Sequence, residues 1–383
     1  HTRYWRDWSS DVCSSDLNGN VTVDVAAGGI NGTGRINAGT GNVTLRTPAG
    51  NVALTSAANQ ISANALMITA LNSTVVNTSV ASLDATITGT GSLTVNEADA
   101  IRITQARTSN GTINLSTSAN SVVNITNVSA AIGTNGNVTV VNGNLYLDTP
   151  GIRATQTVDL QKAQSVTVLS GTINAPVILL PTGQSTLNYQ VTSSADSGPG
   201  SIRDVIARIN AGGGGLNSTI LVTTPTTVAL NSSLPTMTVQ MNVQGNSLLT
   251  LDGTNAGTGA SGFTITSAST TRSTISGVTF QNFGGAGVDL VGAQNISVTG
   301  INVTGSTIGF RASGNLTGSG VYNCTFTNNV FGATLANARN LLVGVNPVGG
   351  VFGGNTFTGG TGYRGTRSEE HTSELQSRQY LVC

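Results

Sequence analysis

The chain has 383 residues, of which only 8% are charged, and its 16 basic residues balance its 16 acidic residues. A near-neutral chain lacks the long-range attraction that basic proteins have for nucleic acid, so we expect no nucleic-acid partner. No stretch approaches the ~20 consecutive apolar residues of a membrane-spanning helix, so we expect no membrane span.

The first segment, residues 1–17 (HTRYWRDWSSDVCSSDL), is related to the last one at the DNA level. The opposite strand of one codon choice for this segment encodes RSEEHTSELQSRQYLV and two bases of a Cys codon, which matches residues 367–383. Unrelated peptides have no reason to be reverse complements, and the string resembles a common sequencing-library adapter. We therefore expect 1–17 and 367–383 to be adapter-derived artefacts that flank an internal fragment of a longer gene, and we exclude them from fold reasoning.

This exclusion changes the set of chemically reactive side chains. The two segments contain both histidines, both tryptophans and four of the 16 basic and six of the 16 acidic residues, which leaves twelve basic against ten acidic residues. Only Cys324 remains of the three cysteines, so we expect no internal disulfide.

Residues 18–186 repeat a short glycine-led pattern of alternating apolar residues, at offsets that are near 20–22 residues between some copies. The copies are GNVTV (19–23), GNVTL (41–45), GNVAL (50–54), GSLTV (91–95), GTINL (111–115), GNVTV (136–140) and GNLYL (143–147). Alternation along a strand directs Val21 and Val23, Val43 and Leu45, and Ile113 and Leu115 to one side. Repeats of this length predict a stack of coils, because a single coil cannot bury its inward residues alone.

The segment 194–215 interrupts the strand pattern. Ile202, Val205, Ile206 and Ile209 have the i, i+3, i+4, i+7 spacing of a helix. Ser201 suits the N-cap, and Gly212–Gly215 end the helix. We predict one short helix near 201–210 that covers the open end of a second solenoid.

Residues 187–366 contain three aligned sets of short strands. The first set is ISGVTF (275–280), VTGINV (298–303) and VYNCTF (321–326), with GGNTF (353–357) after a longer loop. The second set is GVDL (287–290), GFRA (309–312) and GATL (332–335), and the third is NISV (295–298), NLTG (315–318) and NLLV (340–343). Glycine and asparagine stand at the corners, where a positive φ is tolerated.

These patterns predict an all-β fold made of parallel β-helix solenoids. We place the boundary between two domains near residue 187, with 18–186 as the first β-helix repeat domain and 187–366 as the second.

Two resemblances extend this prediction. The GNVTL-type repeats of 18–180 resemble filamentous-haemagglutinin-like exoproteins and autotransporter passengers of Gram-negative bacteria. The run DSGPGSIRDVIARIN, together with the strands that follow it, resembles the opening of right-handed β-helix domains of the pectin-lyase-like superfold. Both resemblances imply an exported, elongated protein of the bacterial cell surface, and neither implies a particular activity.

Candidate chemical groups are few, and each has a structural interpretation. A hydrolase of this superfold needs clustered carboxylates, whereas Asp252 precedes a turn glycine and Asp289 lies on a strand, where we expect it to face outward and to pair with Arg311 one coil later. Glu97 and Asp99 are interpreted as solvated acids of a turn rather than a metal site. We interpret Cys324 as a small buried hydrophobe, because no histidine is present to activate it. We therefore assign no catalytic, cofactor-binding or metal residue, and no cofactor.

The leading hypothesis is a structural or adhesive module of a large secreted bacterial surface protein, whose polar faces bind glycans or host surfaces. The first alternative is a polysaccharide lyase or glycoside hydrolase whose catalytic coils lie outside this fragment. The second alternative is a passive stalk that spaces other domains from the cell.

Overall fold

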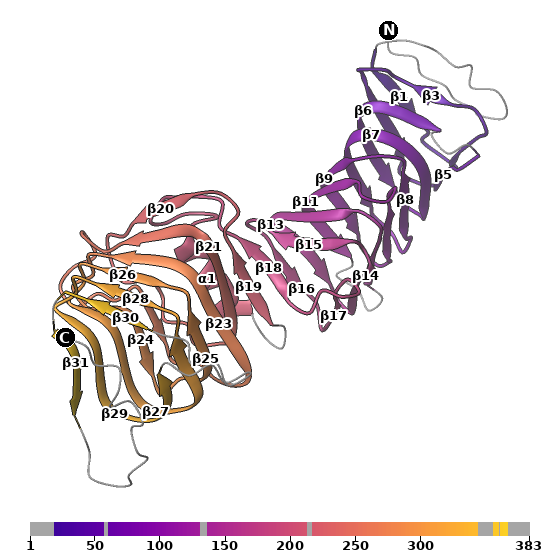
Figure 1. The fold of residues 1–383 in the computed structure, drawn as a ribbon. Coiled ribbons are helices and arrows are strands. Elements are labelled where there is room, and N and C mark those ends of the chain that lie inside the picture. Colours follow the sequence, from indigo (N-terminus) through magenta and orange to yellow (C-terminus); the bar gives the residue numbers. More distant parts are fainter. Residues whose placement is uncertain are drawn as a thin grey trace. The chain divides into compact units, whose positions relative to one another are not determined.

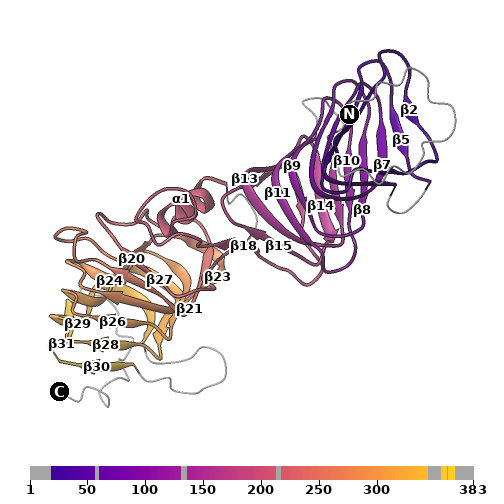
Figure 2. The same cartoon turned by 90° about the horizontal axis from the view of Figure 1, so that it is seen from above.

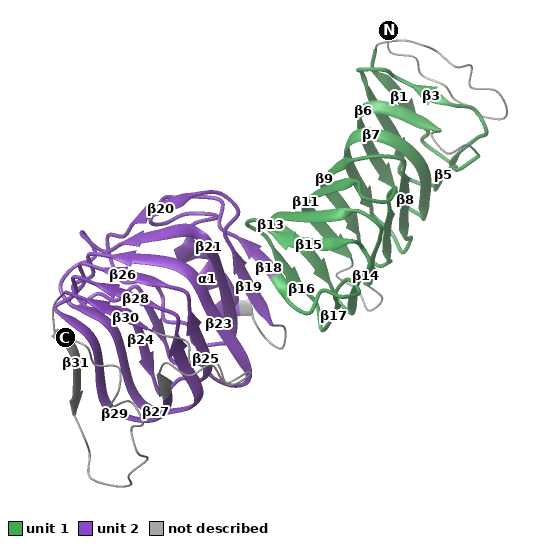
Figure 3. Ribbon diagram, viewed as in Figure 1, with its two compact units in different colours: residues 1–187 green, residues 188–383 purple. Residues whose placement is uncertain are grey.

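The strands of this protein pair in parallel in a computed structural model that describes residues 19–56, 60–130, 136–212, 217–343, 355–359 and 361–366 (Figure 1). With 59% strand and 3% helix, the chain forms a parallel β-solenoid of about 14 turns with a single short helix, which confirms the predicted all-β solenoid. The expected artefacts at 1–17 and 367–383 lie outside the described residues. The chain divides into two compact units, residues 1–187 and 188–383 (Figure 3).

Unit 1 stacks its strands in three columns. The first column comprises β1 (Val21–Asp24), β4 (Asn42–Thr47), most of β6 (Ile61–Ala70), the second half of β7 (Thr74–Ile87), β9 (Ile101–Thr108), β11 (Val122–Ala130), β13 (Asn144–Ala154), β15 (Ser165–Val168) and β16 (Thr172–Asn174). The second comprises β2 (Ile30–Asn31), β5 (Val52–Leu54), the first half of β7, β8 (Leu93–Glu97), β10 (Ile113–Ser116), β12 (Val138–Val141), β14 (Thr157–Lys162) and β17 (Val177–Leu179). The third begins with β3 (Ile36–Asn37) and the first residues of β6.

The glycine-led motifs of unit 1 fall into two of these columns. Gly19, Gly41 and Gly143 each precede a strand of the first column, whereas the motifs that begin at residues 50, 91, 111 and 136 lead into strands of the second. The apparent irregularity of their spacing arises because one coil can contain the motif twice.

The inward residues of unit 1 stack on like residues of neighbouring coils. In the second column the pairing continues through Ile30, Val52, Thr74, Leu93, Ile113, Val138, Val158 and Ile178. Seven of these eight side chains are apolar, and full burial of such a side chain contributes ~1.5–3 kcal/mol, although Ile178 in the last coil is only half-buried. Of the six residues predicted to face inward, Val23, Val43, Leu45, Ile113 and Leu115 are buried, while Val21 in the first strand is half-buried.

Unit 2 also has three faces, and the strand β18 (Leu187–Gln190) lies at the boundary between the units. Its further strands are β19 (Ser218–Leu221), β20 (Thr226–Ala229), β21 (Met241–Asp252), β22 (Phe263–Ile265), β23 (Ala268–Gln281), β24 (Ala286–Val291), β25 (Gln294–Thr299), β26 (Asn302–Thr304), β27 (Ile308–Tyr322), β28 (Thr325–Thr327), β29 (Phe331–Val343), β30 (Thr356–Thr358) and β31 (Thr361–Thr366). One inward column runs through Val228, Leu251, Phe280, Val303, Phe326 and Phe357. The sequence had aligned the last four of these residues, so this column is confirmed.

The third set of predicted strands is wrong in its middle member. The structure pairs Val298 with Val321 and Val321 with Val343, so the partner of NISV is the segment that ends at Val321 and not NLTG (315–318). The register of β27 against β29 shifts twice, on either side of Asn315. These shifts place NLTG in a bend of the coil, where a sequence alignment cannot distinguish it from a strand.

Asparagine and glycine occupy equivalent corners of successive coils in unit 2. Asn282, Gly305, Asn328 and Gly359 follow the ends of β23, β26, β28 and β30, with φ of 60°, 64°, 53° and 70°. Only residues that tolerate the left-handed region fit such a corner, which is the predicted reason for their presence.

The helix α1 (Ile202–Gly212) forms where the sequence predicts one and lies in the first part of unit 2 (Figure 2). Ser201 caps it by accepting a hydrogen bond from the amide of Asp204 (3.2 Å), while the Asp204 carboxylate accepts one from the amide of Gly200 (3.0 Å). The four residues with the predicted helical spacing, Ile202, Val205, Ile206 and Ile209, are fully buried. Asn210 donates to the carbonyl of Thr236 (2.7 Å), which fixes the helix against the segment that leads into β21.

Candidate functional site

Asp289 and Arg311 form an ion pair between neighbouring coils of unit 2. The register places Asp289 of β24 opposite Arg311 of β27, and Arg311 Nη2 lies 2.5 Å from Asp289 Oδ2. The predicted pairing is therefore present. Asp289 is nevertheless not solvated: it is only 5% exposed, while Val288 and Leu290 on either side are fully buried.

Arg311 is the reason that Asp289 is covered. Its guanidinium also reaches Ser261 Oγ (3.4 Å), which belongs to the segment before β22, so the side chain extends over β24. The hydrogen bond to Asp289 raises the pKa of Arg311. The second carboxylate oxygen, Asp289 Oδ1, is buried without a hydrogen-bond partner.

Asp252, the last residue of β21, has a structural role. Asp252 Oδ1 accepts hydrogen bonds from the amide (2.9 Å) and hydroxyl (2.6 Å) of Thr254. Burial by itself raises the pKa of Asp252. The hydrogen bonds from Thr254, together with those from Gln281 and Asn282, outweigh burial, so the pKa is lowered overall. This geometry confirms the predicted turn residue.

Cys324 is 1% exposed, and its thiol donates a hydrogen bond to the carbonyl of Tyr322 (3.3 Å). Burial raises the pKa of the thiol to about 11, so little thiolate forms at neutral pH. The interpretation of Cys324 as a small buried hydrophobe agrees with this environment.

Glu97 differs from its prediction. It was expected to be a solvated acid of a turn, but it is the last residue of β8 and is only 5% exposed. Its Oε2 accepts a hydrogen bond from Thr78 Oγ1 (2.8 Å), and its Oε1 accepts hydrogen bonds from the amides of Val80 (3.2 Å) and Ala98 (3.0 Å). Asp99, by contrast, is exposed as predicted and accepts a hydrogen bond from Ser79 Oγ (3.1 Å).

An open hollow of about 540 Å³ lies beside these acids. Its wall is built from small residues of three successive coils, which are Ser62 and Ala63, Ser79, Val80 and Ala81, and Asp99 and Ala100. Ser62 and Ser79 are register partners, so the hollow follows the stacking direction of unit 1.

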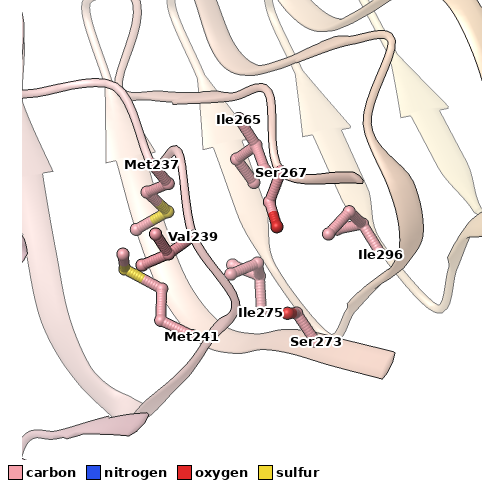
Figure 4. Close-up of a pocket in the computed structure, with 8 residues that line it drawn as sticks. All are labelled: Met237, Val239, Met241, Ile265, Ser267, Ser273, Ile275 and Ile296. Atoms are coloured by element: carbon pink, nitrogen blue, oxygen red, sulfur yellow. The ribbon is translucent and has the colours of Figure 1, made fainter. Parts of the chain in front are cut away.

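A second gap lies inside unit 2 and is too narrow for a water molecule (Figure 4). It is lined by Met237, Val239, Met241, Ile265, Ser267, Ser273, Ile275 and Ile296. The lining is apolar apart from two serines, of which Ser273 has a buried hydroxyl without a partner. The gap is a packing feature of the core and has no room for a ligand.

Outward side chains form polar rows with little charge. Asn64 Nδ2 donates to Asn42 Oδ1 (3.2 Å), and Asn96 Nδ2 donates to Asn77 Oδ1 (2.9 Å) in a second row. Among the described residues, no three His, Cys, Asp or Glu side chains gather closely enough to hold a metal ion. Within the same part of the chain, no helix has the length and apolar character needed to cross a membrane.

Comparison with known proteins identifies no relative of this chain. No protein-family model, no curated protein and no solved structure matches the chain. The fold assignment therefore rests on the strand pairings of the chain itself.

Proposed function

We propose that this chain is a structural and adhesive module of a large secreted bacterial surface protein, in which the solenoid presents polar faces to glycans or host surfaces. The observation that supports this proposal is the stacking of outward Asn, Thr and Ser side chains in rows with one-coil spacing. Thr94 lies beside Asn114 in unit 1, and Asn302 lies beside Thr325 in unit 2. Backbone pairing holds such rows rigid, which reduces the entropy lost when a ligand binds.

The test measures binding of residues 18–366 to immobilised glycans and to host cells. Two variants add charge to one outward face each, Thr94→Glu with Asn114→Glu in unit 1 and Asn302→Glu with Thr325→Glu in unit 2. Loss of binding in one variant would locate the adhesive face. If the folded wild-type chain binds nothing, the passive stalk becomes the better proposal.

The native gene on both sides of codons 18–366 is the first thing to sequence. Further repeats that lead to an export signal or an anchoring domain would support the surface protein. A solenoid that ends within a few coils bearing clustered Asp, Arg and His would favour a polysaccharide lyase or hydrolase instead.

The contact between Asp289 and Arg311 is the observation that favours this second candidate. Charged side chains that are buried beside a specific charged partner occur often at functional sites. We expect Asp289→Ala and Arg311→Ala to leave adhesion unchanged if the pair is structural. Loss of a real polysaccharide-cleaving activity in either variant would overturn the adhesive proposal.

A further inference from the structure

One face of unit 2 carries two rows of outward side chains in which threonine is the commonest residue. Its strands are β20, the second half of β21, the end of β23, and then β26, β28 and β30, of which the last three lie side by side in Figure 1. The first row stacks in register Thr227, Thr250, Thr279, Asn302, Thr325 and Thr356. The second row lies two residues further along each strand and stacks Ala229, Asp252, Gln281, Thr304, Thr327 and Thr358.

The last three coils of these rows form a regular array, which we call the threonine grid. Its positions are Asn302, Thr304, Thr325, Thr327, Thr356 and Thr358. Neighbouring positions are ~4.8 Å apart between coils and ~6.6 Å apart along a strand, because a strand rises ~3.3 Å per residue. Phe326 and Phe357 lie between the two rows, and their rings stack with centroids 4.9 Å apart and planes 14° apart. The side chains beneath the grid therefore repeat from coil to coil with little rotation.

The hydroxyl groups of the threonine grid are available to a ligand. Within the part of unit 2 that the structure describes, none of these threonine hydroxyls has a hydrogen-bond partner, and each side chain is exposed or half-buried. The preceding coils differ, because Gln281 Nε2 donates to Asp252 Oδ2 (3.0 Å) and the two side chains thus bond to each other. No position of the grid carries a charged or aromatic side chain, so ion pairs and ring stacking cannot hold a ligand there.

Ordered water is the ligand that suits such a surface. A threonine hydroxyl donates one hydrogen bond and accepts others, while the adjacent methyl group orders water around it without bonding to it. These groups recur at fixed intervals in two directions, and a crystal face of ice presents water molecules at intervals of similar size. Backbone pairing between coils keeps the positions fixed, which reduces the entropy lost on binding.

We propose that the threonine grid is an ice-binding surface, which anchors the protein to a crystal face of ice through its hydroxyl and methyl groups. This activity goes beyond adhesion to glycans and does not depend on it. The neighbouring face of β24 and β27 does not share the property, because Asp289 and Arg311 form an ion pair there and interrupt any regular array of hydroxyl groups.

The experiment measures thermal hysteresis, the gap between the melting and freezing points of ice in a solution of the intact chain. The wild-type chain should open a gap and shape the growing ice crystal into facets. Thr327→Lys, in the middle coil of the grid, should remove most of the gap, because its long charged side chain retains its own hydration and keeps the ice away. Thr139→Lys is the matched control and should keep the wild-type gap, since Thr139 is an outward, half-buried threonine of β12 in unit 1.

An unshaped ice crystal without a gap in the wild-type solution would overturn the proposal, as would equal gaps for the wild type and a folded Thr327→Lys variant. If Thr327→Lys does not fold, Thr358→Lys replaces it, because Thr358 of β30 is exposed, and the same loss is expected. Glycan binding is measured separately above the melting point. A chain that binds glycans through the grid but leaves ice growth unchanged would assign the grid to a sugar and contradict the ice-binding proposal alone.

Discussion

Most glycine residues of the repeated motif of unit 1 serve close approach between coils, whereas Gly143 has a positive φ of 81°. A Cβ atom on Gly111 would overlap the carbonyl group of Gly91 in the preceding coil, and neither residue has a positive φ. Gly19, at the start of the same type of motif, has no atom within 4 Å of such a Cβ. The glycine of the motif is therefore needed where one coil packs closely on the coil before it. No described coil precedes Gly19.

This difference predicts unequal effects of the same substitution. Gly111→Ala should lower the free energy of unfolding by about 1–3 kcal/mol, because the backbone of one coil must shift. Gly19→Ala should change it by less than about 0.5 kcal/mol. Urea denaturation of both variants checks the expectation, which fails if they behave alike.

Two threonines of β7, Thr74 and Thr78, differ in the hydrogen bonding of their side chains. Both are fully buried, but the Thr74 hydroxyl has no hydrogen-bond partner, whereas the Thr78 hydroxyl donates to Glu97. Thr74→Val should raise the free energy of unfolding by about 1 kcal/mol, because an unpaired hydroxyl is replaced by a methyl group. Thr78→Val should lower it by about 1–2 kcal/mol, because Glu97 loses a donor. Denaturation near pH 7 should give opposite signs, and a shared sign would contradict this account.

At the scale of the element, the inward column of unit 2 contains one small side chain between two phenylalanines. Val303 of β26 lies between Phe280 and Phe326, and Gly287 brings the backbone of β24 against the Val303 methyl groups. No room remains for a larger residue.

Val303→Phe should therefore lower the free energy of unfolding by about 1–3 kcal/mol through overpacking. Asn302→Phe is the control, since the neighbouring side chain on the same strand is exposed. A Val303→Phe variant as stable as the wild type would show that the column packs less tightly than described.

Sequence periodicity predicts these elements well where strands repeat in register, as for Phe280, Val303 and Phe326. It fails at bends such as residues 315–318, because their irregular register leaves no periodic signal. Glu97 was missed for another reason. The acidic run around it suggests a turn, but the alternation in β8 places Glu97 on the same side as Leu93 and Val95, and that signal would have identified it.

At the scale of the whole molecule, each unit depends on how its coils support one another. In a repeat structure, the stability of a coil depends on its neighbours, so a cap protects mainly the coils next to it. In unit 2 we expect α1 to have this task, because its Ile206 side chain is fully buried.

Ile206→Asp should expose the first coil of unit 2 more than the later ones, because it places an unpaired charge under the helix. Hydrogen exchange should show the largest loss of protection in β19 and β21 and a smaller loss toward β27. Ala207→Asp, on the exposed side of α1, should leave the exchange pattern unchanged. A uniform loss across unit 2 after Ile206→Asp would argue against a capping role.

The regular spacing of some coils of unit 2 also bears on how such a chain can change through inheritance. The corners at Asn282, Gly305 and Asn328 follow one another at intervals of 23 residues. A duplication or deletion of a whole coil preserves every inward and outward position, whereas the loss of one residue from a strand exchanges the two sides of that strand. A whole coil is thus the unit that can be gained or lost without disturbing the fold. Related proteins of this kind should therefore differ in length by multiples of one coil.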